Sequence, residues 1–599
     1  MELHIEDRKS LILSAYGKIP CDLAVTNVQL LNVFSGEVYP ATVYIKGKFI
    51  AYIDTDNKPI TKDNALKVLD GKQSFMIPGL IDTHEHIESS MLTPRNFAAS
   101  LIVHGTTTVV TDPHEIANVY GLDGIRYMHD AATDLPMRQF IDIPSCVPAV
   151  PQMECAGANL TFEDILEVIN LPRVIGLGEV MDFVSVATAQ DRIMNIIDTA
   201  KQHHLYIQGH APFLSGRMLS AYICAGPKTC HESRSSEEAK EKIRNGMYVD
   251  ARESSISKNV KTVWDGVKHM KFHDQLTLCT DDKEVDDILY KGHMNDVVRS
   301  AIQAGMDPIL AIRCATLHAA REIHIENLGA IAPGYIADFL LVDSLENVKP
   351  NHVFYEGKLV AKDGKLCKAI EPKSYELEQK NSVYIDYVKK EDLYLKAPIK
   401  QGKVMVHAMK YKTLTSSSTE CIQLEVQVKN GYVILDDPDL KFVAVIHRHN
   451  KLQRMSLGIV KGFGTTKGAL ASTVSHDSHN VTIVYDNVED AWIALQELGA
   501  CKGGMSAVYA QKVLHTLALP LAGLMSLKPA EELSEDVKKM KLANYELGLK
   551  HMENPLLRIV TLALPVIPEI KMSDTGYVDV FQRKHIPLFL NVEKKTKTV

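Results

Sequence analysis

The sequence predicts an α/β protein: a TIM-like (β/α)8 barrel with a flanking split β-sandwich and an additional C-terminal α/β domain. Three observations predict this. Strand-like and helix-like stretches alternate over about 230 residues, a pattern typical of a parallel sheet covered on both faces. Short strand patterns occur on both sides of that block. A further α/β pattern with Gly-rich turns follows it. We place the domain boundaries at 1–73 and 326–371 (the two parts of the sandwich), 74–325 (barrel), 372–412 (connector) and 413–599 (C-terminal domain).

The two flanking segments each contain a hairpin pattern. Thr42–Ile45 turns at Lys46-Gly47-Lys48 into Phe49–Ile53, and His352–Tyr355 turns at Glu356-Gly357-Lys358 into Leu359–Ala361. We therefore expect one small β-sandwich built from both flanks.

The central block supplies the elements of the barrel. Its strand candidates after the first are Thr107–Thr111, Phe140–Ile143, Val174–Leu177, Leu205–Gln208 and Gln275–Cys279. Thr93 as N-cap, Pro94 in the first turn and Gly105 after the end predict a helix over 94–104. Further helices are expected over 162–170, 189–203, 217–225 and 295–304.

Composition excludes several classes of protein. The chain has 599 residues, 46% of them hydrophobic, and a net charge of −8, so a basic face for nucleic acid is not expected. The start, Met1–Asp7, lacks the order of a signal peptide, and the apolar segment 514–527 is too short to span a bilayer. Ten cysteines without a Cys-x-x-Cys pair indicate neither a disulfide framework nor a cysteine zinc site. We expect a cytoplasmic protein without a membrane or nucleic-acid partner.

Chemistry-bearing residues begin in Asp82-Thr83-His84-Glu85-His86, which follows an apolar segment. Residues two apart on a strand share a face, so Asp82, His84 and His86 are expected to point the same way, with both imidazoles reaching one metal ion. Polar clusters also follow the later strands: Asp112–Glu115, Gly178-Glu179, Gly209–Pro212, Cys230–Glu232 and Thr280–Asp282. In a barrel these clusters gather at the C-terminal face, where catalytic residues sit.

The residue types indicate the class of metal. Four imidazoles and two carboxylates without a thiolate suit zinc, iron or manganese. Glu179 is well placed to bridge two ions, and two ions about 3.5–4 Å apart can hold a hydroxide as a nucleophile at neutral pH.

This order of His-x-His, Glu, His, His and Asp resembles the amidohydrolase superfamily. The stretches Asp112–Glu115, Gly178–Met181, Cys230–Glu232 and His476–Asn480 are similar to its adenine deaminase branch. The resemblance implies two divalent ions, manganese or iron foremost and zinc as a further option, and a homo-oligomer such as a dimer. It places the metal ligands at His84, His86, Glu179, His210, His231 and Asp281. Cys230 stands where the family pattern has an acidic residue, so His231 is expected either to bind metal or to contact substrate.

The resemblance also implies a reaction, the hydrolysis of adenine to hypoxanthine and ammonia in purine salvage. Glu115 is the candidate that protonates ring N1, with His231 next, and Asp281 or Asp282 could pass the proton of water to the leaving amine. Alternatively, Glu115 stabilises a helix start. Two other readings of the chain are an amidohydrolase acting on another cyclic amide or amino-substituted nucleobase, and an inactive binding scaffold. The zinc nucleobase deaminase fold is excluded, because no Pro-Cys-x-x-Cys follows His86-Ile87-Glu88.

Two histidine-rich clusters, His447–His449 and His476–Asn480, allow two interpretations. Burying such polar groups without partners is costly. They are expected either to be solvated or to close over the active site.

Overall fold

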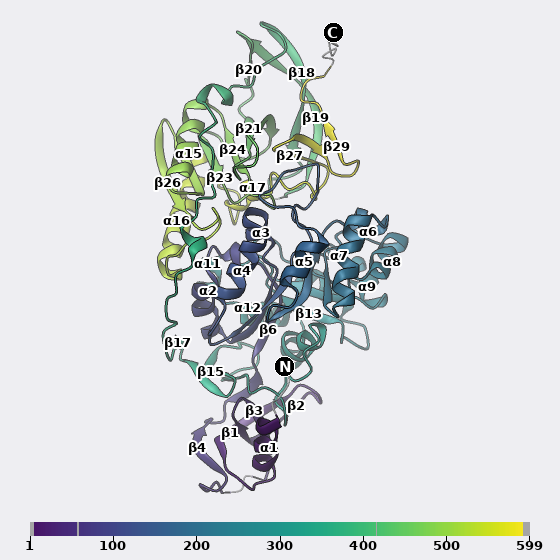
Figure 1. Ribbon diagram of the computed structural model, residues 1–599, viewed down its shortest axis with the longest axis vertical. Helices are drawn as coiled ribbons and strands as arrows, with labels where there is room; N and C mark the ends of the chain where they lie inside the picture. Colours follow the sequence, from purple (N-terminus) through teal and green to yellow (C-terminus); the bar gives the residue numbers. More distant parts are fainter. Residues whose placement is uncertain (1–4, 57–58, 415, 591–599) are drawn as a thin grey trace.

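The computed structural model describes residues 5–56, 59–414 and 416–590, so part of the N-terminal stretch Met1–Asp7 lies outside the described residues. The molecule is elongated, with three parts along its long axis (Figure 1). A sheet from both flanks lies at one end, parallel strands with helices lie in the middle, and a second large sheet lies at the other end. Among the described residues, the helices include none with the length and apolar character needed to cross a membrane.

The middle part is a curled parallel sheet with helices outside it. Five parallel strands pair in sequence order, β6 (Leu80–Glu85), β7 (Thr106–Thr111), β8 (Arg138–Ile143), β9 (Val174–Val180) and β10 (Tyr206–Gly209). Three more form a second parallel set, β11 (Thr229–Cys230), β12 (Tyr248–Arg252) and β13 (Leu276–Cys279). A parallel bridge between Glu85 and Asp281 brings the end of β13 beside the end of β6.

The five predicted strands are present, whereas β11 and β12 were not predicted. β11 has only two residues, too few for a periodic signal. β12 carries Asp250 and Arg252 among its buried residues, which interrupts the apolar run expected of a buried strand. Asp250 is tolerated there because Thr83 and Thr277 both donate to its carboxylate.

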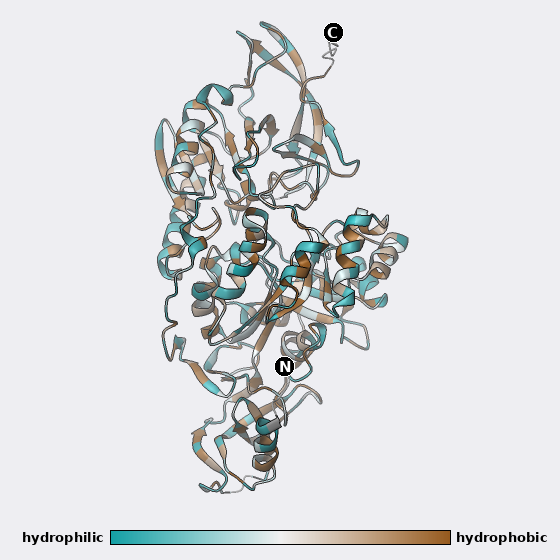
Figure 2. Cartoon of the chain, viewed as in Figure 1, coloured by the Kyte–Doolittle hydropathy of each residue, from teal (hydrophilic) through white to brown (hydrophobic). Residues whose placement is uncertain are grey.

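The predicted helices are also present, with small shifts at their ends. α2 (Pro94–Leu101) begins at the Thr93 cap, whose side chain accepts from Asn96 N–H, and a short 3-10 turn to His104 ends at Gly105 with φ 92°. The others are α5 (Phe162–Val168), α7 (Asp191–Gln202), α8 (Gly216–Ala225) and α12 (Met294–Gln303). Additional helices are α3 (His114–Tyr120), α4 (Leu122–Ala131), α9 (Ser236–Arg244) and α10 (Val260–Val267). Brown apolar segments run along the strands, and teal polar residues lie along the helices (Figure 2).

The two flanking segments meet as predicted, but they form one sheet. β5 (Phe75–Pro78) pairs with β14 (Phe339–Val342) on one side and β1 (Cys21–Asn32) on the other. The remaining strands are β2 (Glu37–Lys46), β3 (Phe49–Asp54), β4 (Ala65–Asp70), β15 (Pro350–Tyr355), β16 (Lys358–Lys362) and β17 (Lys365–Leu366). The two flanks are therefore hydrogen-bonded into one sheet, because β5 joins them edge to edge, and residues of β2 and β3 share a buried core with Phe339 and Phe354 of β14 and β15.

The last part contains a second nine-stranded sheet. It runs from β18 (Gly402–Tyr411) to β26 (Lys512–Ala518) and includes β23 (Ala469–Ser472) and β24 (Val481–Tyr485). α15 (Val488–Ala500) and α16 (Ala530–Leu547) accompany this sheet, and α17 (Leu557–Val560) follows. Lys541 on α16 contacts Glu284 at 2.7 Å, and Ser526 N–H donates to Met91 O at 2.8 Å. These contacts hold the last part against the middle part.

Candidate metal centre and active-site pocket

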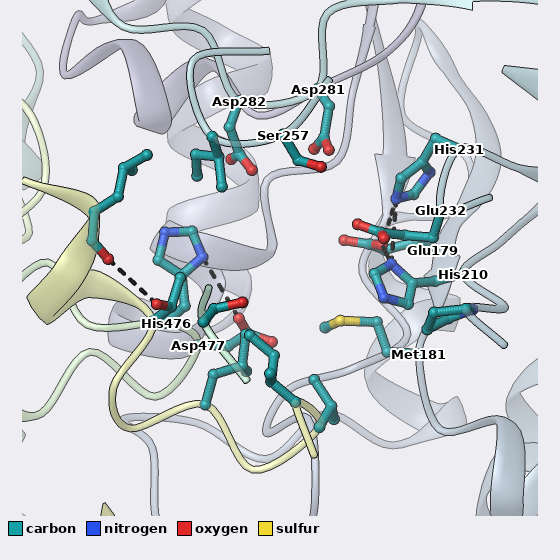
Figure 3. Close-up of a pocket in the computed structure, with 18 of the residues that line it drawn as sticks. Glu179, Met181, His210, His231, Glu232, Ser257, Asp281, Asp282, His476 and Asp477 are labelled. Atoms are coloured by element: carbon teal, nitrogen blue, oxygen red, sulfur yellow. Dashed lines mark hydrogen bonds and ion pairs between the residues drawn. The ribbon is translucent and has the colours of Figure 1, made fainter. Parts of the chain in front are cut away.

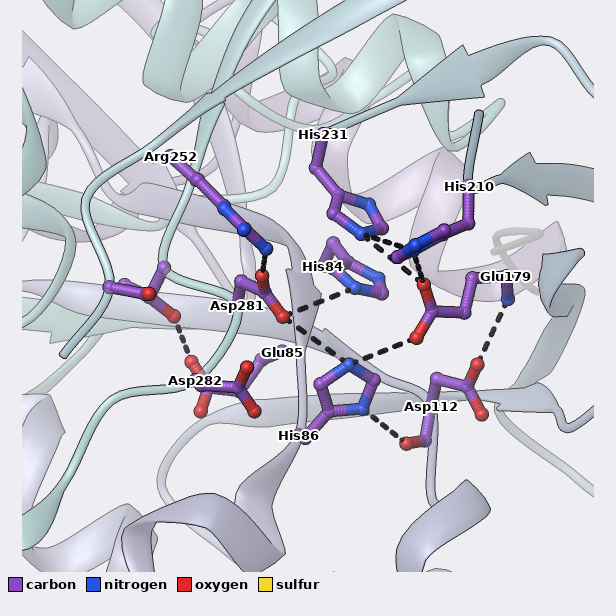
Figure 4. Close-up of polar contacts among 12 residues, drawn as sticks. His84, Glu85, His86, Asp112, Glu179, His210, His231, Arg252, Asp281 and Asp282 are labelled. Atoms are coloured by element: carbon purple, nitrogen blue, oxygen red, sulfur yellow. Dashed lines mark hydrogen bonds and ion pairs between the residues drawn. The ribbon is translucent and has the colours of Figure 1, made fainter. Parts of the chain in front are cut away.

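Six side chains from five places on the parallel sheet converge at the C-terminal ends of its strands (Figure 4). They are His84 on β6, His86 just after it, Glu179 on β9, His210 after β10, His231 after β11 and Asp281 after β13. Five of them are buried, and His210 has the most exposed side chain, at 15%. The fold therefore brings together the six residues that the sequence predicted as metal ligands.

The carboxylate of Glu179 lies between two histidine sets. Its Oε1 is 3.4 Å from His86 Nε2, and its Oε2 is 3.2 Å from His231 Nε2 and in closer contact with His210 Nδ1. The nitrogens of His210 and His231 lie 3.2 Å apart. One oxygen of Glu179 thus faces each set, which is the arrangement a bridging carboxylate needs.

Asp281 completes the set that contains His84 and His86. Its Oδ1 lies 3.6 Å from His84 Nε2 and 3.4 Å from His86 Nε2. Arg252 on β12 contacts the other oxygen and also Glu232, at 2.6 Å. Arg252 was not predicted as a site residue, because the strand that carries it, β12, was not predicted.

Hydrogen bonds to Gln208 set the tautomer of His84. The Gln208 amide nitrogen donates to Thr83 O at 2.6 Å, so its oxygen faces His84 Nδ1 at 2.7 Å. An oxygen acceptor requires Nδ1–H, which leaves Nε2 of His84 with a free lone pair toward the cluster. His86 is set in the same way, because Nδ1 donates to Asp112 O at 2.9 Å.

These donor atoms fit divalent metal ions. Ligand bonds of about 2.1 Å in tetrahedral geometry place neighbouring donor atoms about 3.4 Å apart, close to the 3.2–3.6 Å separations between nitrogens and carboxylate oxygens. His84 Nε2 is buried without a hydrogen-bond partner. Burial lowers the pKa of His84 well below its usual value, which keeps it neutral as a metal ligand must be. Among the described residues, the groups able to hold a metal ion include His84, His86 and Glu179, and also Glu179, His210 and His231.

A cavity of about 350 Å³ opens beside this cluster, within the usual range for small-molecule sites. His476 and Asp477 lie across it from Glu179 and His210 (Figure 3). Part of its wall is apolar and comes from the end of the chain: Met552, Leu557, Leu564, Val566, Ile567 and Pro568. The last part of the chain therefore completes the pocket.

Glu115 lies where the middle part meets the last part of the chain. It is in the first turn of α3 and is 2% exposed. Its Oε1 lies 2.9 Å from His476 Nδ1, and its Oε2 contacts His479 Nε2. Burial raises the pKa of Glu115, but His476 and His479 outweigh it and hold that pKa well below its usual value. Asp282, the other predicted proton carrier, lines the same pocket and accepts from Ser89 Oγ at 2.5 Å.

Other polar residues differ from expectation. Asp82 does not join the six; it accepts from Thr280 N–H at 3.1 Å and lies in a separate buried group with Glu85 and His293. Cys230, which stands where the family pattern has an acidic residue, accepts from Lys242 Nζ at 3.2 Å. His231 nevertheless lies among the six converging residues.

His476–Asn480 is buried rather than solvated, and part of it lines the pocket. His447–His449 is largely buried behind it: Arg448 donates to the carbonyls of Ser382 and Ala522.

Comparison with known proteins defines the class. The amidohydrolase family model matches residues 75–360, and the model named adenine deaminase C-terminal domain matches 416–584. Together with the curled parallel sheet and the convergent ligand set, these matches define a hydrolytic enzyme of the amidohydrolase family. Within that family, the chain belongs to the adenine deaminase family, as its relatives establish.

Three curated adenine deaminases illustrate the similarity. The protein from Clostridium acetobutylicum is 39% identical over 96% of this chain and 99% of its own. The one from Staphylothermus marinus is 39% identical over 98% of both chains, and the one from Halalkalibacterium halodurans is 40% identical over 96% of both. Among solved structures, an atrazine chlorohydrolase mutant from Arthrobacter aurescens is 14% identical over 58% of this chain and 97% of its own, with a TM-score of 0.45.

Proposed function

We propose that this enzyme hydrolyses adenine to hypoxanthine and ammonia, with two divalent metal ions held by His84, His86, Glu179, His210, His231 and Asp281. The near full-length similarity to curated adenine deaminases supports the substrate. The proposal of two metal ions rests on the position of Glu179, which has one carboxylate oxygen toward each histidine set. We further propose that the eight parallel strands act as one closed (β/α)8 barrel and that 413–599 is a separate domain.

The metal ions, when bound, would supply a hydroxide nucleophile at neutral pH. The residues of the chain have other tasks. Gln208 and the carbonyl of Asp112 hold the two imidazoles of the His-x-His pair in the tautomer that presents Nε2. Arg252 holds Asp281 beside them. This shell of hydrogen bonds keeps the ligands oriented before substrate arrives.

The pocket supports a flat heterocyclic substrate. One side offers imidazoles and carboxylates, and the other offers the apolar residues near the end of the chain. A purine ring can pack against the apolar wall while its amino-substituted carbon faces the polar wall. Closing the pocket with the C-terminal residues excludes water from the ring.

Proton transfer is assigned to the carboxylates near the cluster. Asp281 or Asp282 would take a proton from water and pass it to the leaving amine, and Glu115 would serve the ring nitrogen together with its histidine partners. A place in purine salvage, a cytoplasmic location and a dimeric state remain predictions.

A substrate panel tests the proposal. Ammonia release is measured from adenine, guanine, cytosine and 6-aminopurine nucleosides, and ring opening is measured with a cyclic amide such as dihydrouracil. The enzyme is stripped of metal and reloaded separately with manganese, iron or zinc, with metal content measured alongside. We expect adenine to be turned over most efficiently, with activity rising until two ions are bound per chain. Preferred turnover of the cyclic amide would instead establish the alternative substrate class, and full activity at one ion would contradict the binuclear centre.

A further inference from the structure

His476 lies on the wall of the pocket opposite the candidate metal centre. It lies on the loop between β23 and β24, its side chain is 11% exposed, and it faces the candidate metal centre from the opposite wall (Figure 3). Its Nδ1 is 2.9 Å from Glu115 Oε1. A residue from the second large sheet therefore forms a dyad with a carboxylate from the first turn of α3.

His479 leaves Glu115 only one oxygen for this dyad. Ser475 N–H donates to His479 Nδ1 at 3.2 Å, so the ring proton of His479 is on Nε2, which donates to Glu115 Oε2. Burial lowers the pKa of His479 to about 4, and this histidine is neutral at pH 7. Glu115 thus accepts from His479 through Oε2, and its Oε1 lies 2.9 Å from His476 Nδ1 and 3.4 Å from His114 Nε2.

The surroundings of His476 favour its charged form. Burial lowers its pKa, but the carboxylates outweigh burial and raise that pKa to about 9. The groups that face it are Glu115 from α3, Asp477 and His479 from its own loop, Asp282 from the loop after β13, and Glu88 and Glu284, which line an adjoining small cavity with it. His476 therefore carries a proton at neutral pH.

We infer that His476 is a further catalytic residue, which donates a proton to ring N1 of the substrate, with Glu115 as its positioning carboxylate. This inference rests on the proposed function, because the ring nitrogen is that of adenine. It also changes the expected role of Glu115, which supports the proton donor instead of acting as the acid by itself.

The reaction balances with this assignment. As the oxygen of water bonds to C6, one water proton passes to Asp281 or Asp282, and the His476 proton passes to N1. The C6–N6 bond then breaks, and N6 leaves as ammonia with the proton from the aspartate. The remaining proton on the C6 oxygen returns to the His476–Glu115 dyad as the C6 carbonyl forms. The products are hypoxanthine and ammonia, and the enzyme regains its starting protonation state.

The test uses the metal-loaded full-length enzyme and three variants: His476→Gln, His476→Ala and the control His447→Gln. His447 is also buried but does not line the pocket. We expect kcat for adenine to fall by about 10²–10⁴-fold in both His476 variants, with metal content unchanged. The wild-type rate should decline as pH rises through about 9, where His476 loses its proton, and this decline should be absent in His476→Gln. Added imidazole should restore part of the activity of His476→Ala, and His447→Gln should match the wild type.

Three outcomes overturn the inference: unchanged kcat in His476→Gln, loss of metal together with activity, or an unchanged decline near pH 9 in that variant. Ammonia release from adenine by the wild type is measured first. Its absence would refute the proposed function itself, whereas normal wild-type activity with active His476 variants would refute only the role of His476.

Discussion

Asp281 donates its backbone N–H to the carbonyl oxygen of His84, 3.0 Å away, and His86 N–H donates to Asp281 O at 3.2 Å. This pair of bonds ties the loop after β13 to the end of β6, although the two residues lie almost two hundred positions apart in the sequence. Asp281 has φ 62°, and the local turn points its carboxylate at the two imidazoles. The position of Asp281 in the ligand set thus depends on these two backbone hydrogen bonds as well as on its side chain.

Glu179→Gln should abolish both metal binding and activity, because a neutral amide bridges two cations poorly and offers only one oxygen. Metal content per chain is measured after reloading with manganese. Glu154→Gln is a matched control: Glu154 is buried, accepts from Val150 N–H at 3.1 Å and lies outside the ligand set. Two ions retained in Glu179→Gln would show that this residue is not the bridge.

Gln208→Leu should weaken metal binding by about 10–100-fold, because His84 loses the acceptor that sets its tautomer. Gln208→Glu keeps an acceptor for His84 Nδ1 and should bind metal more tightly than the leucine variant. Competition with a chelator measures the affinities, and thermal unfolding of the metal-free proteins separates a folding defect from a binding defect. Equal affinity in the leucine variant and the wild type would show that Gln208 does not orient His84 for metal binding.

Glu115→Gln should reduce kcat by about 10²–10⁴-fold with near-normal metal content and a smaller change in KM. The amide keeps the shape of the side chain but no longer stabilises a proton on His476. Steady-state kinetics with adenine measure the split between kcat and KM. Full activity would mean that the carboxylate only stabilises the start of α3.

Lys571→Met should change how stability depends on pH. Lys571 is fully buried, donates to Ser417 O at 2.7 Å and Thr561 O at 3.1 Å, and thereby ties together two segments of the pocket wall. Burial lowers its pKa to about 7, below the value of the unfolded chain. Between pH 7 and the ordinary lysine pKa of about 10.4, the unfolded state binds more protons, so this residue makes the free energy of unfolding rise with pH.

Denaturant unfolding of the metal-free proteins at pH 7, 8 and 9 checks this expectation. The difference in unfolding free energy, wild type minus Lys571→Met, should increase with pH. Lys528→Met is a control, because Lys528 pairs with Asp536 and its side chain is 48% exposed. A difference that stays constant or decreases from pH 7 to 9 would contradict the lowered pKa of Lys571.

Much of the site could be predicted because it depends on local pattern. Histidines two apart at a strand end and carboxylates after later strands follow from alternation along strands and from the common edge of a parallel sheet. β12 was missed because Asp250 is buried with hydroxyl donors from distant strands, so its apolar signal is interrupted. Asp82 was misplaced because the pairing of β6 with β7 shifts register between Asp82 and Glu85, which breaks the alternation.

The sequence by itself determined most of the parallel strands of the middle part, the six ligand-type residues and the family resemblance, because short-range periodicity and residue chemistry encode them. Only the tertiary structure decided three other features. It joined the two flanks into one sheet through β5, set the tautomers of His84 and His86, and brought His476 to Glu115, more than three hundred residues earlier. These features depend on contacts between residues far apart in the chain, whose geometry no local pattern specifies.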